Sequence, residues 1–310
     1  MRAGIFILIS HMLRTIALLC FSLLAIPALV FWFDLPPSAD QWEILRLLAR
    51  ICVIAAGLCF LVSSMTRNYS QVDKLWSIMP IVYVWVVVIH TGYNPRLLLM
   101  AVLVSLWGVR LTYNFARRGG YHWKFWTGEE DYRWAVLRQK PGLRKPLVWM
   151  LFNLCFISFY QMGLVLLFTL PIVKAMPGKG LQIWDGILAL ALIILLVIET
   201  RADQQQWAFQ NAKKNAGHSD PKYAHGFVRS GLWQYSRHPN YAAEQGIWIV
   251  FYLFSVVATG SVFNWSVAGV LLLLLLFDSS ANFSEGISAE KYPEYRAYQK
   301  RVGKFLPGIG

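Results

Sequence analysis

Charged residues are scarce in this chain of 310 residues: Asp, Glu, Lys and Arg make up 15% of it, against roughly 25% in an average soluble domain. Acidic residues are the scarcer sign, with 16 Asp and Glu against 29 Lys and Arg. Because 57% of the residues are hydrophobic, the chain is neither a disordered protein nor a coiled coil. It also lacks the composition of an ordinary soluble enzyme.

Cysteine is scarce as well, which excludes a disulfide scaffold. The four cysteines are Cys20, Cys52, Cys59 and Cys155, all within apolar stretches, and none pairs at the Cys-x-x-Cys spacing of metal sites. We therefore expect no metal site and no redox role, because a thiol in an apolar helix is usually a small hydrophobe. The sequence also lacks internal repeats. Its one low-complexity segment, the leucine run 271–276, is typical of a lipid-facing helix.

Long apolar stretches are what the chain has in abundance. A transmembrane helix needs about 20 mostly apolar residues, and eight stretches approach that length. They are 12–33, 44–63, 77–91, 96–116, 147–172, 183–201, 244–259 and 263–282. The first carries Arg14 and has no small-residue cleavage site, which favours a retained anchor over a removed signal peptide.

The net charge of +13 has two candidate explanations, nucleic-acid binding and the collection of Lys and Arg in cytosolic loops. With a cytosolic N-terminus, the inner segments hold 23 Lys and Arg and the outer loops hold 3. The inner segments are 1–15, 64–76, 117–146, 199–241 and 283–310. This asymmetry predicts an all-α, polytopic membrane helical bundle of 7 or 8 transmembrane helices. It excludes nucleic acid as the partner.

Polar residues in or beside membrane spans are costly, so they are candidate functional residues. Glu199, Asp203, Gln206 and Gln210 follow helical spacing and form one stripe at the end of the sixth span. Two interpretations remain open. The stripe either emerges into water at the cytosolic face or lines a polar ligand cavity.

A second polar segment leads into the seventh span. Pro239 suits the first turn of a helix, whose N-terminal amides would form an anion site beside Arg229 and Arg237. Asn240 and Glu244 lie one turn apart on that helix. The combination predicts a site for an anionic, nucleotide-sized ligand.

The alternative for this segment is an interfacial belt of aromatic anchors and snorkelling arginines. That belt would account for Trp233 and Tyr235, but it accounts poorly for Asn240 and Glu244, which continue into the span.

Three further polar regions have open alternatives. Asp73 stands at the mouth of the third span, where it either stabilises the helix dipole or has a functional role. The loop 117–146, with its run Gly128–Trp134, is either a cap over the cytosolic opening or a solvated charge run. In the tail, residues 290–302 are expected to form a short amphipathic basic helix, which would serve the site or grip anionic lipid.

The segment Gly231–Glu244, with its Ser-Arg-His-Pro-Asn-Tyr core, resembles the signature of the steroid 5-alpha-reductase-like membrane enzymes. It is more similar still to their bacterial branch, long catalogued as a domain of unknown function. The resemblance covers residues 45–307. It implies an N-terminal anchor helix in 1–43, a reductase-like membrane domain in 44–310, and a cofactor site in 199–310.

The resemblance implies an NADPH-dependent reductase of a carbon–carbon double bond conjugated to a carbonyl in a lipid. The implied cofactor-binding residues are Glu199, Asp203, Arg229, Tyr235, Arg237, His238, Asn240, Tyr241, Glu244, Asn282 and Glu285. Asn240, Glu244 and Asp203 match the family by position, whereas Glu199 stands where the steroid enzymes have Asn. Asn282 and Glu285 stand about where the family has His and Tyr.

The residues that correspond to the family's substrate site differ more from the family pattern than the cofactor residues do. Steroid reductases polarise the ketone with a Gln, Glu and Tyr set, whereas this chain has Ser70–Asp73. The family's Tyr position falls near Trp107, and Tyr113 is the nearest tyrosine. Asp73 and Tyr113 are therefore the candidate catalytic donors. The implied substrate is a lipid-like enone or enoyl compound drawn from the bilayer.

A second enzyme class carries a similar signature. Isoprenylcysteine and phospholipid methyltransferases hold S-adenosylmethionine with an Arg-His-Pro-x-Tyr segment, usually followed by a Gly that is Ala243 here. They end in paired glutamates, whereas Glu285 is followed by Gly286. A transporter or lipid-binding scaffold is the non-enzyme alternative, and it would place polar groups near mid-membrane in repeated halves. We expect a multi-pass protein of a bacterial inner membrane with its cofactor site facing the cytosol; the oligomeric state stays open.

Overall fold

The computed structural model describes residues 18, 21–124, 126–178, 180–216, 223 and 225–308. Over these residues the regular structure is helical, and a single parallel β-bridge joins Ser236 to Gly303. Seven described helices are long and apolar enough to cross a membrane. They are Ala39–Thr66, Gln71–His90, Pro95–Ala116, Pro146–Lys174, Ile183–Asn215, Pro239–Thr259 and Val267–Lys291. The prediction of an all-α, polytopic membrane bundle is confirmed.

Seven of the eight predicted spans correspond to these helices, with shifted boundaries. The predicted span 77–91 begins earlier, because α3 (Gln71–Trp76) leads directly into α4 (Ile78–His90). The predicted start of the seventh helix at Pro239 is confirmed. Of the predicted first span 12–33, the described part contains a shorter apolar helix, Phe21–Trp32, while residues 1–17 and 19–20 lie outside the described residues.

The chain divides into two compact units, which we describe separately. Unit 1 comprises Met1–Asp185 and Tyr252–Leu272, and unit 2 comprises Gly186–Phe251 and Leu273–Gly310. The predicted anchor of residues 1–43 is a different division, and it stays a prediction.

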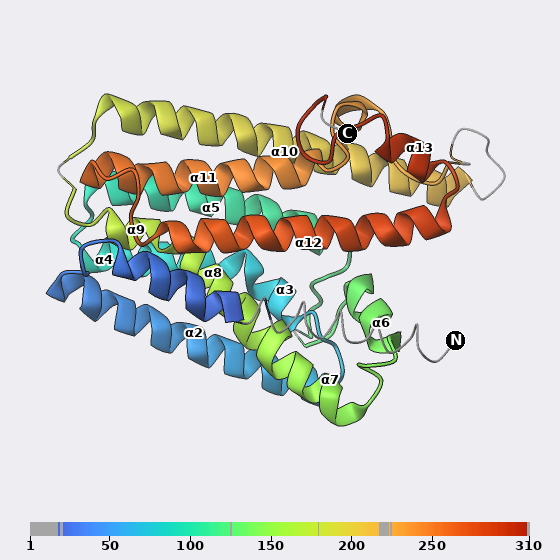
Figure 1. Ribbon diagram of the computed structural model, residues 1–310, viewed down its shortest axis with the longest axis horizontal. Helices are drawn as coiled ribbons and strands as arrows, with labels where there is room; N and C mark the ends of the chain where they lie inside the picture. The colour runs from blue at the N-terminus through green and yellow to red at the C-terminus, as the bar shows by residue number, and fades with distance from the viewer. Residues whose placement is uncertain are drawn as a thin grey trace. The chain divides into compact units, whose positions relative to one another are not determined.

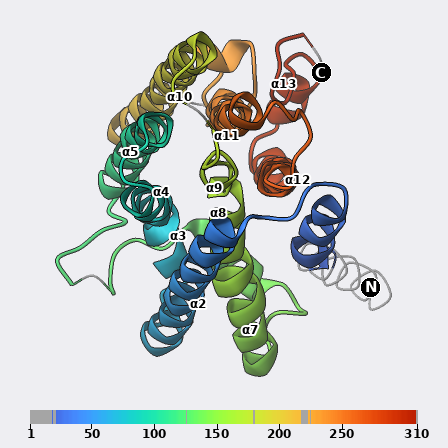
Figure 2. The same ribbon diagram turned by 90° about the vertical axis from the view of Figure 1, so that its left-hand side faces the viewer.

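In unit 1, one long helical segment forms the centre. It consists of α7 (Pro146–Phe152), the π-helix η1 (Asn153–Tyr160) and α8 (Gln161–Thr169), followed by the short α9 (Pro171–Lys174). The segment packs against α2 (Ala39–Thr66) and α4, as the green and blue ribbons of Figure 1 and Figure 2 show. The short α3 contacts α8 as well, so three helices pack on the segment.

A second packing in unit 1 pairs α4 with α5 (Pro95–Ala116), and the two helices lie side by side in both views. Gly108 makes the close approach possible, because a Cβ atom there would lie 2.6 Å from the Ser77 carbonyl oxygen. A larger residue at this position would push the helices apart.

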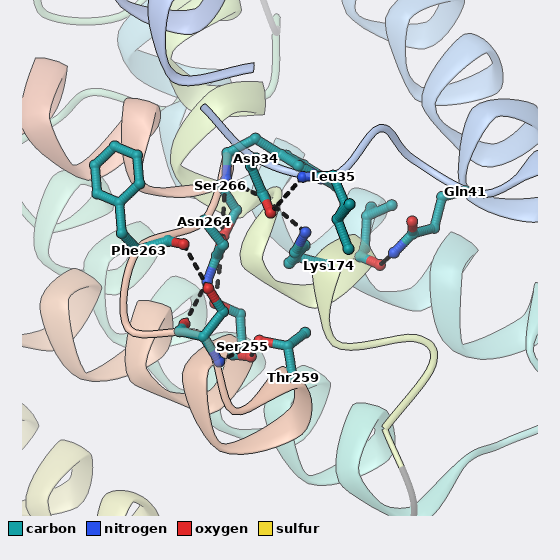
Figure 3. Close-up of polar contacts among 12 residues, drawn as sticks. Asp34, Leu35, Gln41, Lys174, Ser255, Thr259, Phe263, Asn264 and Ser266 are labelled. Carbon is teal, nitrogen blue, oxygen red and sulfur yellow. Dashed lines mark hydrogen bonds and ion pairs between the residues drawn. The ribbon is translucent and has the colours of Figure 1, made fainter. Parts of the chain in front are cut away.

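Two ion pairs connect segments of unit 1 that are far apart in the sequence. Lys174 donates to Asp34 at 2.6 Å, and the Trp265 backbone N–H donates to the same carboxylate at 2.8 Å (Figure 3). Arg96, which is fully buried, donates from Nε to Asp185 at 2.8 Å. Both acids lie opposite a cation, so neither charge is buried unpaired.

Unit 2 contains most of α10 (Ile183–Ala216), with α11 (Pro239–Thr259), α12 (Val267–Lys291) and α13 (Tyr295–Gln299). The α11 helix lies between α10 and α12 (Figure 1, Figure 2). A Cβ atom at Gly246 of α11 would meet Leu195 of α10 at 3.1 Å, and Tyr241 of α11 stacks edgewise on Phe277 of α12 at 4.8 Å.

The tail corrects one expectation. Residues 290–302 do not form one helix, because α12 continues to Lys291 and Pro293 then interrupts the chain. Proline lacks the N–H that a helix interior needs and disfavours helical backbone in the residue before it. A separate helix of 5 residues, α13, follows.

Candidate functional site

The signature segment folds as a short 3₁₀-helix, η3 (Gly231–Gln234), that is fastened to α10. The Trp233 indole donates to the Ala202 carbonyl at 3.1 Å, and Leu232 N–H donates to Gln205 Oε1 at 2.9 Å. Gly231 has φ +65°, and a Cβ atom there would meet the Gln205 side chain. These contacts fix the start of the signature on the polar end of α10.

The C-terminal segment fastens the rest of the signature. The backbone N–H groups of Arg237 and His238 donate to the carbonyls of Gly303 and Lys304 at 2.9 and 3.0 Å. The Tyr298 hydroxyl, whose pKa burial raises, donates to the Trp233 carbonyl. The amides of Arg237 and His238 are thus taken by the tail, so an anion at this helix start would have to rely on other donors.

Glu285 is the centre of a buried charged cluster. Its Oε1 accepts from Arg237 Nε at 2.7 Å and lies 2.9 Å from His238 Nε2, while its Oε2 accepts from Gln299 Nε2 at 2.7 Å. Arg237 Nη1 also donates to the Gln299 and Val302 carbonyls at 2.8 and 2.5 Å. The Arg237 guanidinium therefore points into the protein and positions Glu285.

A second polar face joins α10 to α11. Asn240 Nδ2 donates to Asp203 Oδ1 at 3.1 Å, and Trp248 Nε1 donates to Glu244 Oε1 at 3.0 Å. Glu199, Asp203 and Glu244 are each only 4–5% exposed. The first half of the α10 stripe, Glu199 and Asp203, is thus turned into the protein, whereas Gln206 and Gln210 are half-buried. The ligand-cavity interpretation stays a prediction.

The side-chain oxygen of Asn240 lacks a hydrogen-bond partner on this face. Within the described residues, the buried Asn240 Oδ1 makes no hydrogen bond. A buried acceptor without a donor costs free energy, and such groups in native proteins commonly bind water or a ligand.

Three of the four remaining predicted residues of unit 2 lie apart from these clusters, and the fourth, Tyr241, packs beside one of them. Arg229 forms an exposed ion pair with Glu294 at 2.7 Å, and the Tyr235 ring is 58% exposed. Asn282 is exposed and accepts from Lys304 Nζ at 2.8 Å. Tyr241 stacks on the His238 ring with centroids 5.3 Å apart, so it supports the Glu285 cluster.

In unit 1, Asp73 lies in the first turn of α3, half-buried beneath a cap. Trp134, in the first turn of α6 (Tyr132–Gln139), donates its indole N–H to Asp73 Oδ2 at 3.0 Å. Asp131 caps α6 by accepting from Arg133 N–H at 2.9 Å. Burial opposes ionisation of Asp131, but the Arg133 guanidinium outweighs it and lowers the pKa of that carboxyl.

The cap is formed by residues 121–124 and 126–134, and hydrogen bonds fasten it along residues 68–74. The Lys74 ammonium donates to the Thr127 carbonyl at 2.6 Å, and Asp131 N–H donates to Ser70 Oγ at 2.9 Å. Asn68 Nδ2 donates to the Gly128 carbonyl at 2.9 Å. This part of the loop is therefore packed against the chain and is not a freely solvated charge run, while a cytosolic opening beneath it stays a prediction.

Tyr113 differs from Asp73. Its ring is 66% exposed on α5, and the Arg117 guanidinium lies 5.8 Å from the ring centroid. Within the described residues no contact joins it to Asp73, so Asp73 is the better-placed donor of the two.

Two residues of these clusters, Trp134 and Gln299, were not predicted. The position of Trp134 could have been predicted from the neighbouring sequence, because a capping Asp places the residue three positions later in the first turn of the helix. Gln299 has none in the sequence, because its partner Glu285 is brought to it by the corner between α12 and α13.

Residues 59–302 match the family model described as a protein of unknown function, DUF1295. The chain belongs to the DUF1295 family. An uncharacterized protein from Schizosaccharomyces pombe is 39% identical over 265 residues, which cover 80% of this chain and 75% of the relative. No solved structure is significantly similar to the chain.

The DUF1295 match contains both clusters. Asp73 with its cap and the Glu285 cluster fall inside residues 59–302, whereas Lys304, which pairs with Asn282, lies just beyond. A relative in a yeast also means that DUF1295 membership does not by itself assign a protein to a bacterial membrane.

Proposed function

We propose that this DUF1295 protein is an NADPH-dependent reductase of a carbon–carbon double bond conjugated to a carbonyl in a lipid or steroid-like compound. The resemblance of Gly231–Glu244 to steroid 5-alpha-reductase-like enzymes suggests the reaction. The observation that carries the proposal is the buried polar face of Asp203, Asn240 and Glu244 directly beside that segment.

The residues of this face fit a dinucleotide. Ribose hydroxyls and a carboxamide bring hydrogen-bond donors, and the unpartnered Asn240 Oδ1 and the buried Asp203 and Glu244 carboxylates are acceptors. Arg229 is a candidate phosphate ligand. Its pair with Glu294 is exposed, so exchange of one anion for another would cost little.

When bound, NADPH would supply a hydride to the conjugated double bond. Hydride addition to the β-carbon leaves negative charge on the substrate's carbonyl oxygen, and a proton from water then adds to the α-carbon to complete the reduction. A donor aimed at the carbonyl oxygen typically lowers the barrier to hydride addition by about 3 kcal/mol. Asp73 can be that donor only in its protonated form. Because the Trp134 indole can only donate, Oδ2 is an acceptor and the proton would be carried on Oδ1.

The packed cap gives this step its surroundings. The cap covers Asp73 and restricts water, which strengthens electrostatic interactions at the carboxyl. Asp131 and Arg133 neutralise each other at 2.9 Å beside it, so the cap adds no unpaired charge. We place the cofactor face toward the cytosol of a bacterial inner membrane, in line with the charge asymmetry of the loops.

A methyltransferase is the second candidate. Buried carboxylates such as Glu199, Glu244 and Glu285 also suit the positively charged sulfonium and amine of S-adenosylmethionine. Arg229 is the feature that favours the dinucleotide, because S-adenosylmethionine has no phosphate.

The two candidates separate in one experiment. Purified full-length protein is heated with NADPH or with S-adenosylmethionine, and thermal unfolding is followed. We expect NADPH to raise the midpoint and S-adenosylmethionine to leave it unchanged, because a ligand that binds only the folded state stabilises it. Stabilisation by S-adenosylmethionine alone contradicts the reductase.

Variants test the face itself. Asn240→Ala and Glu244→Ala should weaken NADPH binding about tenfold or more, since each removes a buried polar contact. The matched control is Thr200→Val, an exposed position on α10 next to Glu199 that should bind normally. Unchanged affinity in both alanine variants would defeat the site assignment.

A further inference from the structure

The corner between α12 and α13 presents a basic depression that the proposed function does not use. Arg296, Gln299, Lys300 and Ala289 line an open depression of about 600 Å³. Three of these residues come from α13 and the residue after it, and Ala289 comes from the last turns of α12. The depression is thus built from a folded corner and not from one flexible tail.

The buried side of this corner holds the cations in place. Tyr295 and Tyr298 pack on Phe227 with ring centroids 4.9 and 5.2 Å away, and all three side chains are buried. Because α13 is pinned on this aromatic side, Arg296 and Lys300 stay on its exposed side.

The two cations have no acidic partner. Within the described residues, neither Arg296 nor Lys300 forms an ion pair, and nearby acids pair elsewhere: Glu294 with Arg229, and Glu285 with Arg237. Glu290, next to Ala289, is the one acid left in this part of the sequence. The basic residues there outnumber it: they are Lys291, Arg296, Lys300 and Arg301.

The place of the corner in the chain suggests its ligand. Lys291 ends a candidate membrane span of 25 residues, which is longer than the roughly 20 that the hydrocarbon core requires. Its last turns and α13 therefore lie at the level of lipid headgroups. Arginine forms bidentate bonds with phosphate oxygens, and lysine adds a point charge.

We infer that this depression binds the phosphate of an anionic phospholipid headgroup. An open depression suits a headgroup whose acyl chains stay in the bilayer, whereas a nucleotide is usually largely enclosed by its site. Gln299 also donates to Glu285, so a headgroup in the depression lies one side chain away from the buried charged cluster.

The test uses purified full-length protein in detergent, titrated with mixed micelles of pure phosphatidylcholine or of phosphatidylcholine and phosphatidylglycerol in equal parts. Thermal unfolding reports binding. We expect stabilisation by the phosphatidylglycerol micelles only. In the double variant Arg296→Gln/Lys300→Gln the apparent affinity should fall roughly tenfold or more, because each basic residue near a membrane surface strengthens binding to anionic lipid.

Two further variants act as controls. Arg301→Gln/Lys214→Gln removes the same charge from exposed positions of unit 2 that do not line the depression, and it should bind normally. Arg296→Lys/Lys300→Arg keeps the charge and should retain binding, which shows that a loss in the glutamine variant is not misfolding.

Three outcomes would overturn the inference. Equal stabilisation by both lipids would show no preference for an anionic headgroup. An equal loss in the Arg301→Gln/Lys214→Gln control would show diffuse attraction and no site. The third outcome is that inorganic phosphate or NADPH displaces phosphatidylglycerol from the parent protein but not from Arg296→Gln/Lys300→Gln. That result would assign the depression to a soluble phosphate compound.

Discussion

At the residue scale, the acidic side chains of this protein differ in the hydrogen-bond partners that the tertiary structure brings to them. Asp73 receives an indole donor from Trp134, whereas Glu285 receives an arginine, a histidine and a glutamine. A carboxyl beside a neutral donor can serve as an acid, while one neutralised by Arg237 is better suited to hold structure. Two carboxyl side chains thus have different proposed roles.

Asp34 offers a pH test of this reasoning. Burial opposes its ionisation, but Lys174 and the Trp265 and Leu35 amides outweigh burial and lower its pKa below the ordinary 3.8. A carboxyl with a lowered pKa stabilises the fold above its unfolded-state pKa, and this contribution is lost as the pH falls through the folded-state pKa. Asp34→Asn should therefore cost about 3 kcal/mol at neutral pH, since it leaves Lys174 buried without an acid.

Thermal or denaturant unfolding against pH measures this cost. The difference between the parent and Asp34→Asn should hold from neutral pH down to about 3.8 and shrink below it. Asp34→Asn/Lys174→Met should recover part of the stability, because it removes the stranded charge. A difference that does not change with pH would mean that the carboxylate charge contributes nothing.

Some site residues can be recognised from their own position in the sequence, whereas others join the site only through a partner that lies far along the chain. Asn240, Glu244 and Asp73 are recognisable because polar residues at the ends of apolar spans are rare. The partners of Glu285 are not, because Gln299 reaches it only after Pro293 turns the chain. Arg237 illustrates the limit: its charge suggests phosphate, but its guanidinium is occupied within the fold.

At the element scale, α12 shows why composition alone misjudges a helix. The leucine run 271–276 is typical of a lipid-facing helix, and that expectation is wrong for part of it. Leu272 and Leu273 are fully buried, whereas Leu271 and Leu275 are 40% and 48% exposed. Identical residues have no visible periodicity, so the buried face of α12 is set by what packs against it, and Gly269 makes that packing close.

Gly269 provides the corresponding prediction. A Cβ atom there would overlap the backbone of Leu167 and Phe168 in α8, and backbone atoms cannot rotate away. Gly269→Ala should therefore lower the free energy of unfolding by about 2 kcal/mol, as overpacking of a close contact typically does.

Gly286 on the same helix is the matched control. A Cβ atom there would meet nothing within 4 Å, so Gly286→Ala should be neutral or stabilise by up to about 1 kcal/mol through helix propensity. Thermal unfolding of the two variants side by side checks both signs. Equal effects of the two substitutions would rule out the close contact at Gly269.

At the scale of the whole molecule, the structure sharpens the charge asymmetry read from the sequence. Two of the three Lys and Arg residues in the predicted outer loops, Arg96 and Lys174, are buried in ion pairs with Asp185 and Asp34. The third, Lys179, lies outside the described residues. Inner cations such as Arg296 and Lys300 are exposed instead. Among the described outer residues, therefore, every positive charge is neutralised, which strengthens the positive-inside assignment.

That assignment predicts which loops a reagent outside the cell can reach. The four cysteines are replaced by alanine, and one cysteine is introduced as Gln139→Cys in a predicted inner loop or as Val262→Cys in a predicted outer one. Both positions are exposed, with Val262 at 78%. In intact cells, a membrane-impermeant maleimide should label Val262→Cys and not Gln139→Cys, and opening the membrane should make both react.

A permeant maleimide should label both in intact cells, which shows that each thiol is reactive. Labelling of Gln139→Cys alone in intact cells would invert the topology, and the cofactor face would then have to be sought outside the cytosol.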